Sequence, residues 1–190
     1  MNAAANEFIT SLQDNSQELM QTLKIPAERY EMFAKLAVGI AEKESEFDRD
    51  TFTKYNIKEN FPLAVDFYKW WNDDKSAHSS GLTQIKIGDW QDKQALEYCK
   101  QFGVDEKTIW NPDKSAIATI ILLNSMYNYE VKRGSLKQNI QELDLTDEQA
   151  LLYLWNDRSQ IRNKTATPAY SLYIKDVQRN YKNFEFEIVE

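Results

Sequence analysis

Three glutamates stand at alternate positions in the segment AVGIAEKESEF (residues 37–47), namely Glu42, Glu44 and Glu46. A carboxyl group can act as a general acid when its surroundings let it keep a proton near neutral pH. Burial has this effect, because a low dielectric disfavours the ionised form. The chemistry of this segment therefore depends on whether one glutamate lies on a buried face of its helix while the others are solvated.

The periodicity of a helix predicted over residues 27–46 separates the three glutamates. At 100° per residue, one apolar stripe contains Phe33, Leu36, Ala37, Ile40 and Phe47. Glu44 falls in the middle of that stripe, whereas Glu42 and Glu46 point to the opposite side. Glu44 is therefore a candidate general acid. The ordinary alternative is a glutamate that pairs with an arginine or a helix N-terminus, or that is exposed where the stripe ends.

The elements around this helix are predicted to be mainly α, because the chain has only 5 Gly and 4 Pro and little strand alternation. Helical spacing and end signals predict further helices over 3–23, 61–71, 88–101 and 168–181, and after Asn111 and Thr146. Thr146 and Gln149 form a predicted capping box. The run after Asn111 is apolar enough to be buried on nearly all sides. The tail, residues 183–190, is expected to form a short strand or to fray.

Composition limits the possible functions. A length of 190 residues suits one domain, and the net charge of −7 argues against nucleic acid as the main partner. The chain has no apolar run long enough to insert into a membrane. Cys99 is the only cysteine, which excludes an internal disulfide. With one histidine as well, neither a zinc cluster nor a Cys-His nucleophile is expected.

Five segments, in one order, resemble the motifs of the lytic transglycosylase (SLT) family of the lysozyme-like superfamily. They are AVGIAEKESEF, SSGLTQIKIGDW (79–90), IWNPDKSAIATIILL (109–123), LLYLWN (151–156) and YIKDV (173–177). The family pattern is a helix ending in Glu-Ser, a Gly-Leu-Met-Gln-Ile turn, a Pro-x-x-Asn-Ile helix start, an Ala-Tyr-Asn helix end and a final Tyr-x-x-x-Val helix. The resemblance covers residues 33–180.

This resemblance implies a mainly α, lysozyme-like catalytic domain over residues 26–183. An added N-terminal helical extension is expected over 1–25 and a C-terminal tail over 184–190, and the segment at about 48–80 is enlarged. In the site, the resemblance assigns the catalytic acid to Glu44. The residues it assigns to substrate binding are Ser45, Gly81, Leu82, Gln84, Ile85 and Asn156.

Four positions depart from the family pattern. Thr83 replaces Met, which is expected to make one wall of the groove more polar, and Ser115 replaces Asn. Trp155 replaces Tyr, so a hydroxyl near the catalytic acid is expected to be lost. Ala169 stands where some members have an acidic residue.

The implied reaction cleaves the β-1,4 bond between N-acetylmuramic acid and N-acetylglucosamine in peptidoglycan glycan strands. Glu44 protonates the leaving oxygen, and the 2-acetamido group of the substrate stabilises C1, which is one of the exceptions to catalysis by two carboxylates. Glu44 then accepts a proton from the muramyl 6-hydroxyl, which attacks C1 and leaves a 1,6-anhydro end. The reaction needs no metal and no cofactor.

Two alternatives remain open at this point. A muramidase, similar to goose-type lysozyme, needs a second carboxylate, for which Asp73 and Asp74 are the candidates, although both also fit ordinary loop chemistry. A non-catalytic, peptidoglycan-binding component of a secretion or phage apparatus is the other. The substrate implies action in the periplasm or cell wall. The first residues, MNAAANEFIT, lack the features of a signal peptide, so we expect either a trimmed leader or delivery outside the Sec route.

Overall fold

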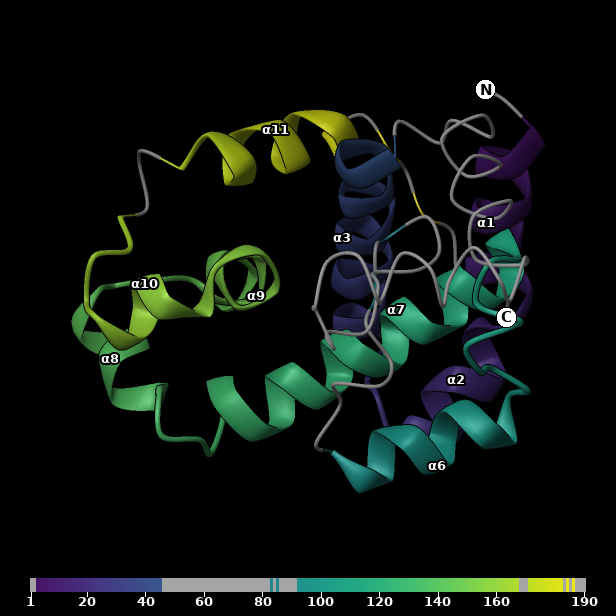
Figure 1. The fold of residues 1–190 in the computed structure, drawn as a ribbon, viewed down its shortest axis with the longest axis horizontal. Helices are drawn as coiled ribbons and strands as arrows, with labels where there is room; N and C mark the ends of the chain where they lie inside the picture. The colour runs from purple at the N-terminus through teal and green to yellow at the C-terminus, as the bar shows by residue number, and fades with distance from the viewer. Residues whose placement is uncertain are drawn as a thin grey trace, which may run out of the picture.

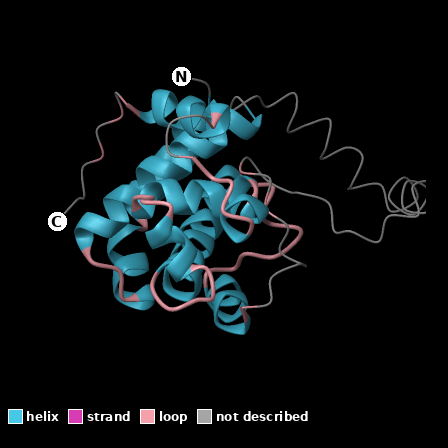
Figure 2. Ribbon diagram, turned by 90° about the vertical axis from the view of Figure 1, so that its left-hand side faces the viewer, coloured by secondary structure: helices cyan, strands magenta, loops and turns pink. Residues whose placement is uncertain are grey.

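The computed structural model describes residues 3–45, 83, 85, 92–167, 171–182, 184 and 186. Helices account for nearly all the regular structure in these residues (Figure 2), which confirms the prediction of a mainly α chain. In chain order they are α1 (Ala3–Asp14), α2 (Ser16–Leu23), α3 (Ala27–Ser45), α6 (Lys93–Gln101), α7 (Pro112–Met126), the π-helix η2 (Tyr127–Val131), α8 (Lys137–Glu142), α9 (Asp147–Asn156), α10 (Arg158–Arg162) and α11 (Leu172–Tyr181). The helix predicted over 61–71 and the enlarged segment at 48–80 lie outside the described residues.

The prediction of one helix over residues 3–23 is wrong, because the chain breaks at Asn15 into α1 and α2. The side-chain amide of Asn15 donates to the backbone carbonyl of Ser11 at 2.9 Å. The backbone amide of Asn15 donates to the same carbonyl at 3.1 Å, so the Ser11 carbonyl accepts from two nitrogens of Asn15 at the break. α2 then ends at Lys24, whose φ of 55° and ψ of 46° give a left-handed cap.

α7 lies at the centre of the core and contacts α1, α2, α3, α6 and α9 (Figure 1). Its residues are buried on nearly all sides, as predicted. Ser11 on α1 donates to the Asp113 carbonyl at the start of α7 at 3.1 Å, so α1 belongs to the common core. The boundary expected at residue 25 stays a prediction. None of the described helices, α7 included, is long and apolar enough to cross a membrane.

The helix ends agree in part with the predicted caps. Thr146 and Gln149 form the predicted capping box, with bonds of 3.2 Å and 3.0 Å. Asn111 precedes α7 as predicted, but its side chain makes no capping hydrogen bond. α11 begins at Leu172 rather than at residue 168, because Ser171 has an extended backbone and its hydroxyl accepts from the Ile174 amide at 3.3 Å.

α11 lies across the C-terminal part of α3, and the two helices make a close contact at Gly39 (Figure 1). A Cβ atom at Gly39 would lie 2.7 Å from both the Tyr181 ring and the Val177 carbonyl oxygen. Only glycine therefore allows the two backbones to approach so closely. This contact sets the position of α11 relative to the end of α3, where Glu44 lies.

Candidate active site

Glu44 is one residue from the C-terminal end of α3 and is half-buried. The hydroxyl of Tyr173, at the start of α11, donates a hydrogen bond of 2.7 Å to Glu44 Oε1. Within the described part of the chain, Glu44 Oε2 accepts no hydrogen bond. The carboxyl group is therefore oriented through Oε1 by the phenol of Tyr173.

The residues of the stripe predicted for α3 are buried where the structure describes them, but so are Val38, Gly39 and Ala41, so this part of the helix is buried on more than one side. Phe33, Leu36, Ala37 and Ile40 are fully buried, and Glu42 is exposed, as expected. Glu46 and Phe47 lie outside the described residues. The periodicity thus distinguishes Glu44 from Glu42 correctly.

The phenol of Tyr173 acts as a donor rather than as an acid. Burial, and then the negative charge and hydrogen bond of Glu44, raise the pKa of the Tyr173 hydroxyl far above its usual range. The proton therefore stays on the phenol at any physiological pH, and the bond to Glu44 persists whenever the carboxyl group is ionised.

An ion pair fixes α11 beside this hydrogen bond. Lys43, the residue before Glu44, lies 2.5 Å from Asp176 on α11. The hydrogen bond from Lys43 lowers the pKa of Asp176, and the charge of Arg179 adds to the effect. Two consecutive residues of α3 are thus bound by two residues one turn apart on α11, which positions Tyr173 against Glu44.

The resemblance missed the role of Tyr173. It predicts the loss of a hydroxyl near Glu44 because Trp155 replaces a tyrosine, but Tyr173 supplies a hydroxyl there. Trp155 is half-buried and packs against the core. Tyr173 does stand at the head of the YIKDV segment. The sequence therefore placed Tyr173 in a family motif, but it did not indicate which residue the Tyr173 side chain contacts.

The predicted substrate-binding residues fall in different places. Ser45 is buried, and its hydroxyl donates to the Ala41 carbonyl at 2.8 Å, which closes the last turn of α3. Ile85 is buried in the core. The predicted residues that lie outside the described part of the chain are Gly81, Leu82, Gln84, Asp73 and Asp74.

Asn156 is exposed at the last position of α9. The corner that follows it is held by the Asp157 carboxylate, which accepts from the Ser159 amide at 3.0 Å, and by an ion pair between Arg158 and Glu130 of η2. Among the described residues, Asn156 makes no hydrogen bond to Glu44. Its expected contact with substrate stays a prediction.

Thr83 and Ser115, two of the departures from the family pattern, meet in one buried cluster. The Thr83 hydroxyl lies 2.8 Å from the Thr119 hydroxyl and 3.5 Å from that of Ser115, and all three side chains are fully buried. Thr119 also donates to the Ser115 carbonyl at 2.7 Å. The Thr83 hydroxyl therefore bonds to side chains of α7 inside the core. The expectation that it makes a groove wall more polar is wrong.

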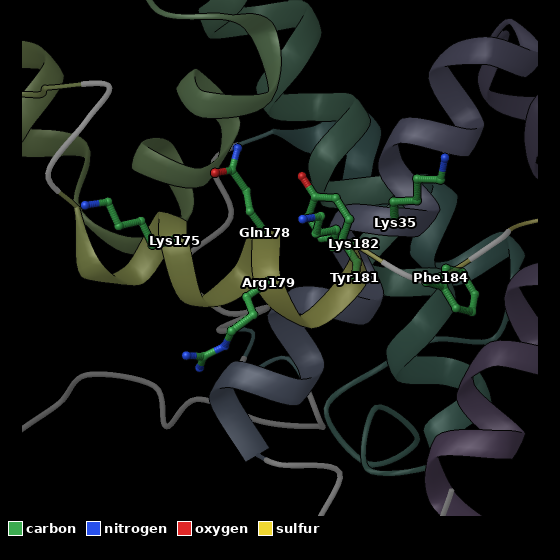
Figure 3. Close-up of a pocket in the computed structure, with 7 residues that line it drawn as sticks. All are labelled: Lys35, Lys175, Gln178, Arg179, Tyr181, Lys182 and Phe184. Atoms are coloured by element: carbon green, nitrogen blue, oxygen red, sulfur yellow. The ribbon is translucent and has the colours of Figure 1, made fainter.

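A concave surface lies where the C-terminal part of α11 meets α3. It is a groove of about 560 Å³ whose lining includes Lys35, Lys175, Arg179 and Lys182 (Figure 3). Figure 3 shows that these cationic side chains point in different directions, so they do not converge on one point. Lys35 is nine residues before Glu44 on α3, which is about 14 Å along the axis and roughly half a turn around it. Arg179, however, both lines this groove and pairs with Asp176 at 3.1 Å, so the groove adjoins the part of α11 that positions Tyr173.

Among the described residues, no group of three or more histidine, cysteine, aspartate or glutamate side chains could hold a metal ion. Besides Glu44 with Tyr173, the described residues hold a second half-buried carboxylate with a phenol donor. Glu148 on α9 accepts hydrogen bonds from the Tyr181 hydroxyl and, at 2.8 Å, from the Gln178 side-chain amide. Comparison of the chain with protein-family models, with curated proteins and with solved structures finds no match.

Proposed function

We propose that this chain is a peptidoglycan-cleaving lytic transglycosylase with a lysozyme-like fold. The observation that carries the proposal is the hydrogen bond from Tyr173 to Glu44 Oε1, at a half-buried helix end that the sequence resemblance independently assigns to the catalytic acid. One oriented carboxyl group suffices for this reaction, because the substrate supplies its own acetamido group in place of a second carboxylate.

In the proposed reaction, Glu44 first acts as an acid and then as a base. It donates its proton to the glycosidic oxygen between N-acetylmuramic acid and N-acetylglucosamine as that bond breaks. The resulting carboxylate then takes the proton of the muramyl 6-hydroxyl, whose oxygen forms the new bond to C1. The enzyme ends in its starting protonation state, and the product carries a 1,6-anhydro end.

Tyr173 is a positioning residue in this scheme. Its phenol contacts Glu44 through Oε1, so Oε2 is the oxygen that exchanges the proton with substrate. As Glu44 loses its proton, the bond from Tyr173 becomes charge-assisted and therefore stronger. The contact thus stabilises the carboxylate that forms when the glycosidic bond breaks.

Peptidoglycan lies outside the cytoplasmic membrane, so the proposal implies action in the periplasm or cell wall. The groups expected to hold the glycan strand are those of the segment around Gln84, together with Asn156.

The proposal is tested by the loss of turbidity of purified sacculi. The wild-type chain should clear the suspension, and the near-isosteric Glu44→Gln should slow clearing by at least about a hundredfold. Glu42→Gln is the matched control, because it removes the same charge from the exposed face of the same helix and should leave the rate unchanged. A wild-type chain that binds sacculi without clearing them would favour the non-catalytic alternative and overturn the proposal.

A further inference from the structure

A cavity of about 440 Å³ lies between the end of α2, α6, α7 and η2, in the described part of the chain. Lys24, which lines it, precedes α3, whereas Glu44 is near the other end of that helix. The length of α3 places the two sites roughly 25 Å apart. The cavity is within the size range of small-molecule sites, and the Glu44 chemistry does not use it.

Two tyrosines line this cavity. Tyr98 on α6 is half-buried, and Tyr129 on η2 is 52% exposed, which is unusual for so large a ring among the described residues. Their hydroxyls are joined through Gln94, whose side-chain amide donates to Tyr98 at 3.0 Å and whose carbonyl lies 3.5 Å from Tyr129. Aromatic rings of this kind combine an apolar face with a polar tip and suit a ligand that has both characters.

Amide side chains form another part of the lining. Asn128 donates to the side-chain carbonyl of Asn124 at 3.1 Å, and Asn124 is buried while Asn128 is half-buried. Each amide carries two donor hydrogens and one acceptor oxygen, so this contact leaves capacity on both residues. An acetamido group of a ligand in the cavity could therefore both donate a hydrogen bond to these amides and accept one from them.

The backbone that carries Asn128 and Tyr129 is a π-helical turn. The Lys132 amide donates to the Tyr127 carbonyl at 2.9 Å, five residues earlier, which is the bond of a π-helix. π-helical turns are rare and are found frequently at functional sites. In this chain the widened turn carries both Asn128 and Tyr129 into the lining.

Other lining residues of the cavity are buried or hydrogen-bonded within the protein. Ala95 and Ile121 are buried and line it, and Ser125 donates to the Asp92 carboxylate at 2.5 Å. The other Asp92 oxygen accepts from the Gln94 amide at 2.9 Å, so this acid caps α6. Both oxygens of the Asp92 carboxylate thus accept hydrogen bonds from within the protein.

We propose that this cavity is a saccharide-binding subsite that accepts an N-acetylated amino sugar. The rings of Tyr98 and Tyr129 contact the apolar faces of the sugar, and the amides of Asn124 and Asn128 pair with its acetamido group. That the ligand is a saccharide is inferred from the residues that line the cavity. That the saccharide is an N-acetylated amino sugar rests in addition on the proposed function. The subsite would hold the glycan at a distance from the bond that is cleaved.

The test uses the full chain carrying Glu44→Gln, so that the probe is not turned over. The probe is the β-1,4-linked tetramer of N-acetylglucosamine, and binding is followed through the NMR signals of the Asn124 and Asn128 side-chain amides. These signals should shift saturably with the probe. Tyr129→Ala, which truncates an exposed ring, should weaken this binding about tenfold. Leu172→Ala, the matched truncation of an exposed apolar side chain on α11, should leave it unchanged.

The tetramer of glucose, which lacks acetamido groups, should bind at this cavity at least about tenfold more weakly. Equal binding of the two tetramers would overturn the assignment to an amino sugar. Absence of shifts at Asn124 and Asn128, or shifts that Tyr129→Ala leaves unaltered, would overturn the subsite as a whole. Because sacculus clearing is measured separately with the wild-type active site, failure of the subsite and failure of the proposed function are distinguishable.

Discussion

The hydroxyl of Tyr173 lies 2.7 Å from Glu44 Oε1, although the two residues are 129 positions apart in the sequence. The bond joins the start of α11 to the end of α3. It connects a candidate acid that local periodicity can identify to a donor that only the tertiary structure brings near. The catalytic proposal therefore depends on how α11 is docked.

Removal of the phenol hydroxyl tests the positioning role directly. Tyr173→Phe keeps the ring but leaves Glu44 without its donor, and we expect kcat for sacculus clearing to fall roughly tenfold or more with KM little changed. The free energy of unfolding should fall by only about 1 kcal/mol, as for a typical hydrogen bond. Steady-state kinetics and urea denaturation measure the two quantities. A fall in stability with kcat unaltered would assign Tyr173 a purely structural role.

The close contact at Gly39 gives a second prediction. Gly39→Ala puts a methyl group 2.7 Å from the Tyr181 ring and the Val177 carbonyl, so α11 must shift. We expect a loss of stability of roughly 1–3 kcal/mol, although Gly→Ala within a helix is normally stabilising. Because the shift also moves Tyr173, kcat should fall as well.

Gly103→Ala is the control for that variant. Gly103 has a φ of 65° and no atom near its missing Cβ, so alanine there is strained but displaces nothing. It should cost about 1 kcal/mol of stability and leave kcat unchanged. Equal effects of the two variants on kcat would show that activity follows stability alone rather than the docking of α11.

The ion pair of Lys43 with Asp176 makes stability depend on pH. The hydrogen bond from Lys43 lowers the folded-state pKa of Asp176 below its ordinary value of 3.8. The stabilisation is therefore fully present above that ordinary value and is lost as the pH falls through the lowered one. Lys43→Met should lower Tm at neutral pH, and the difference from wild type should vanish in strong acid.

Lys35→Met serves as the control for this pH dependence. Lys35 pairs with Glu31 at 2.6 Å within α3 and so does not join two helices. We expect a smaller change in Tm at neutral pH than for Lys43→Met. A pH-independent difference between wild type and Lys43→Met would contradict the assignment to Asp176.

Cys99 should be unreactive in the folded protein. It is 1% exposed, and burial raises the pKa of its thiol to about 12. Since the thiolate is the reactive form, a disulfide reagent at pH 8 should modify the native chain very slowly and the urea-unfolded chain at once. Absorbance of the released thiol anion measures both rates. Rapid native modification would show that α6 opens readily.

Local patterns predicted local features correctly. The buried stripe of α3, the capping box at Thr146 and the buried character of α7 each depend on residues a few positions apart. These three features could be predicted because helix geometry alone decides which side chains share a face. The break at Asn15 was missed, because it interrupts for one residue a helix pattern that continues on both sides.

Long-range contacts were not predictable in the same way. Nothing in the spacing of Tyr173 indicates that its hydroxyl meets Glu44, and Gly39 looks like an ordinary weak point in a helix until α11 is seen against it. Thr83 was expected at a groove wall, but its hydroxyl finds Thr119 in the core. In each case the decisive partner lies on another helix, far away in the sequence.

The most direct test of the central claim is mass spectrometry of the fragments that the wild-type chain releases from purified sacculi. Catalysis by Glu44 as acid and then base predicts disaccharide-peptides that end in 1,6-anhydro-N-acetylmuramic acid, and predicts their absence with Glu44→Gln. Fragments with ordinary reducing ends, which carry one additional water, would contradict the transglycosylase and identify a hydrolase. Anhydro fragments that persist undiminished with Glu44→Gln would contradict the role of Glu44.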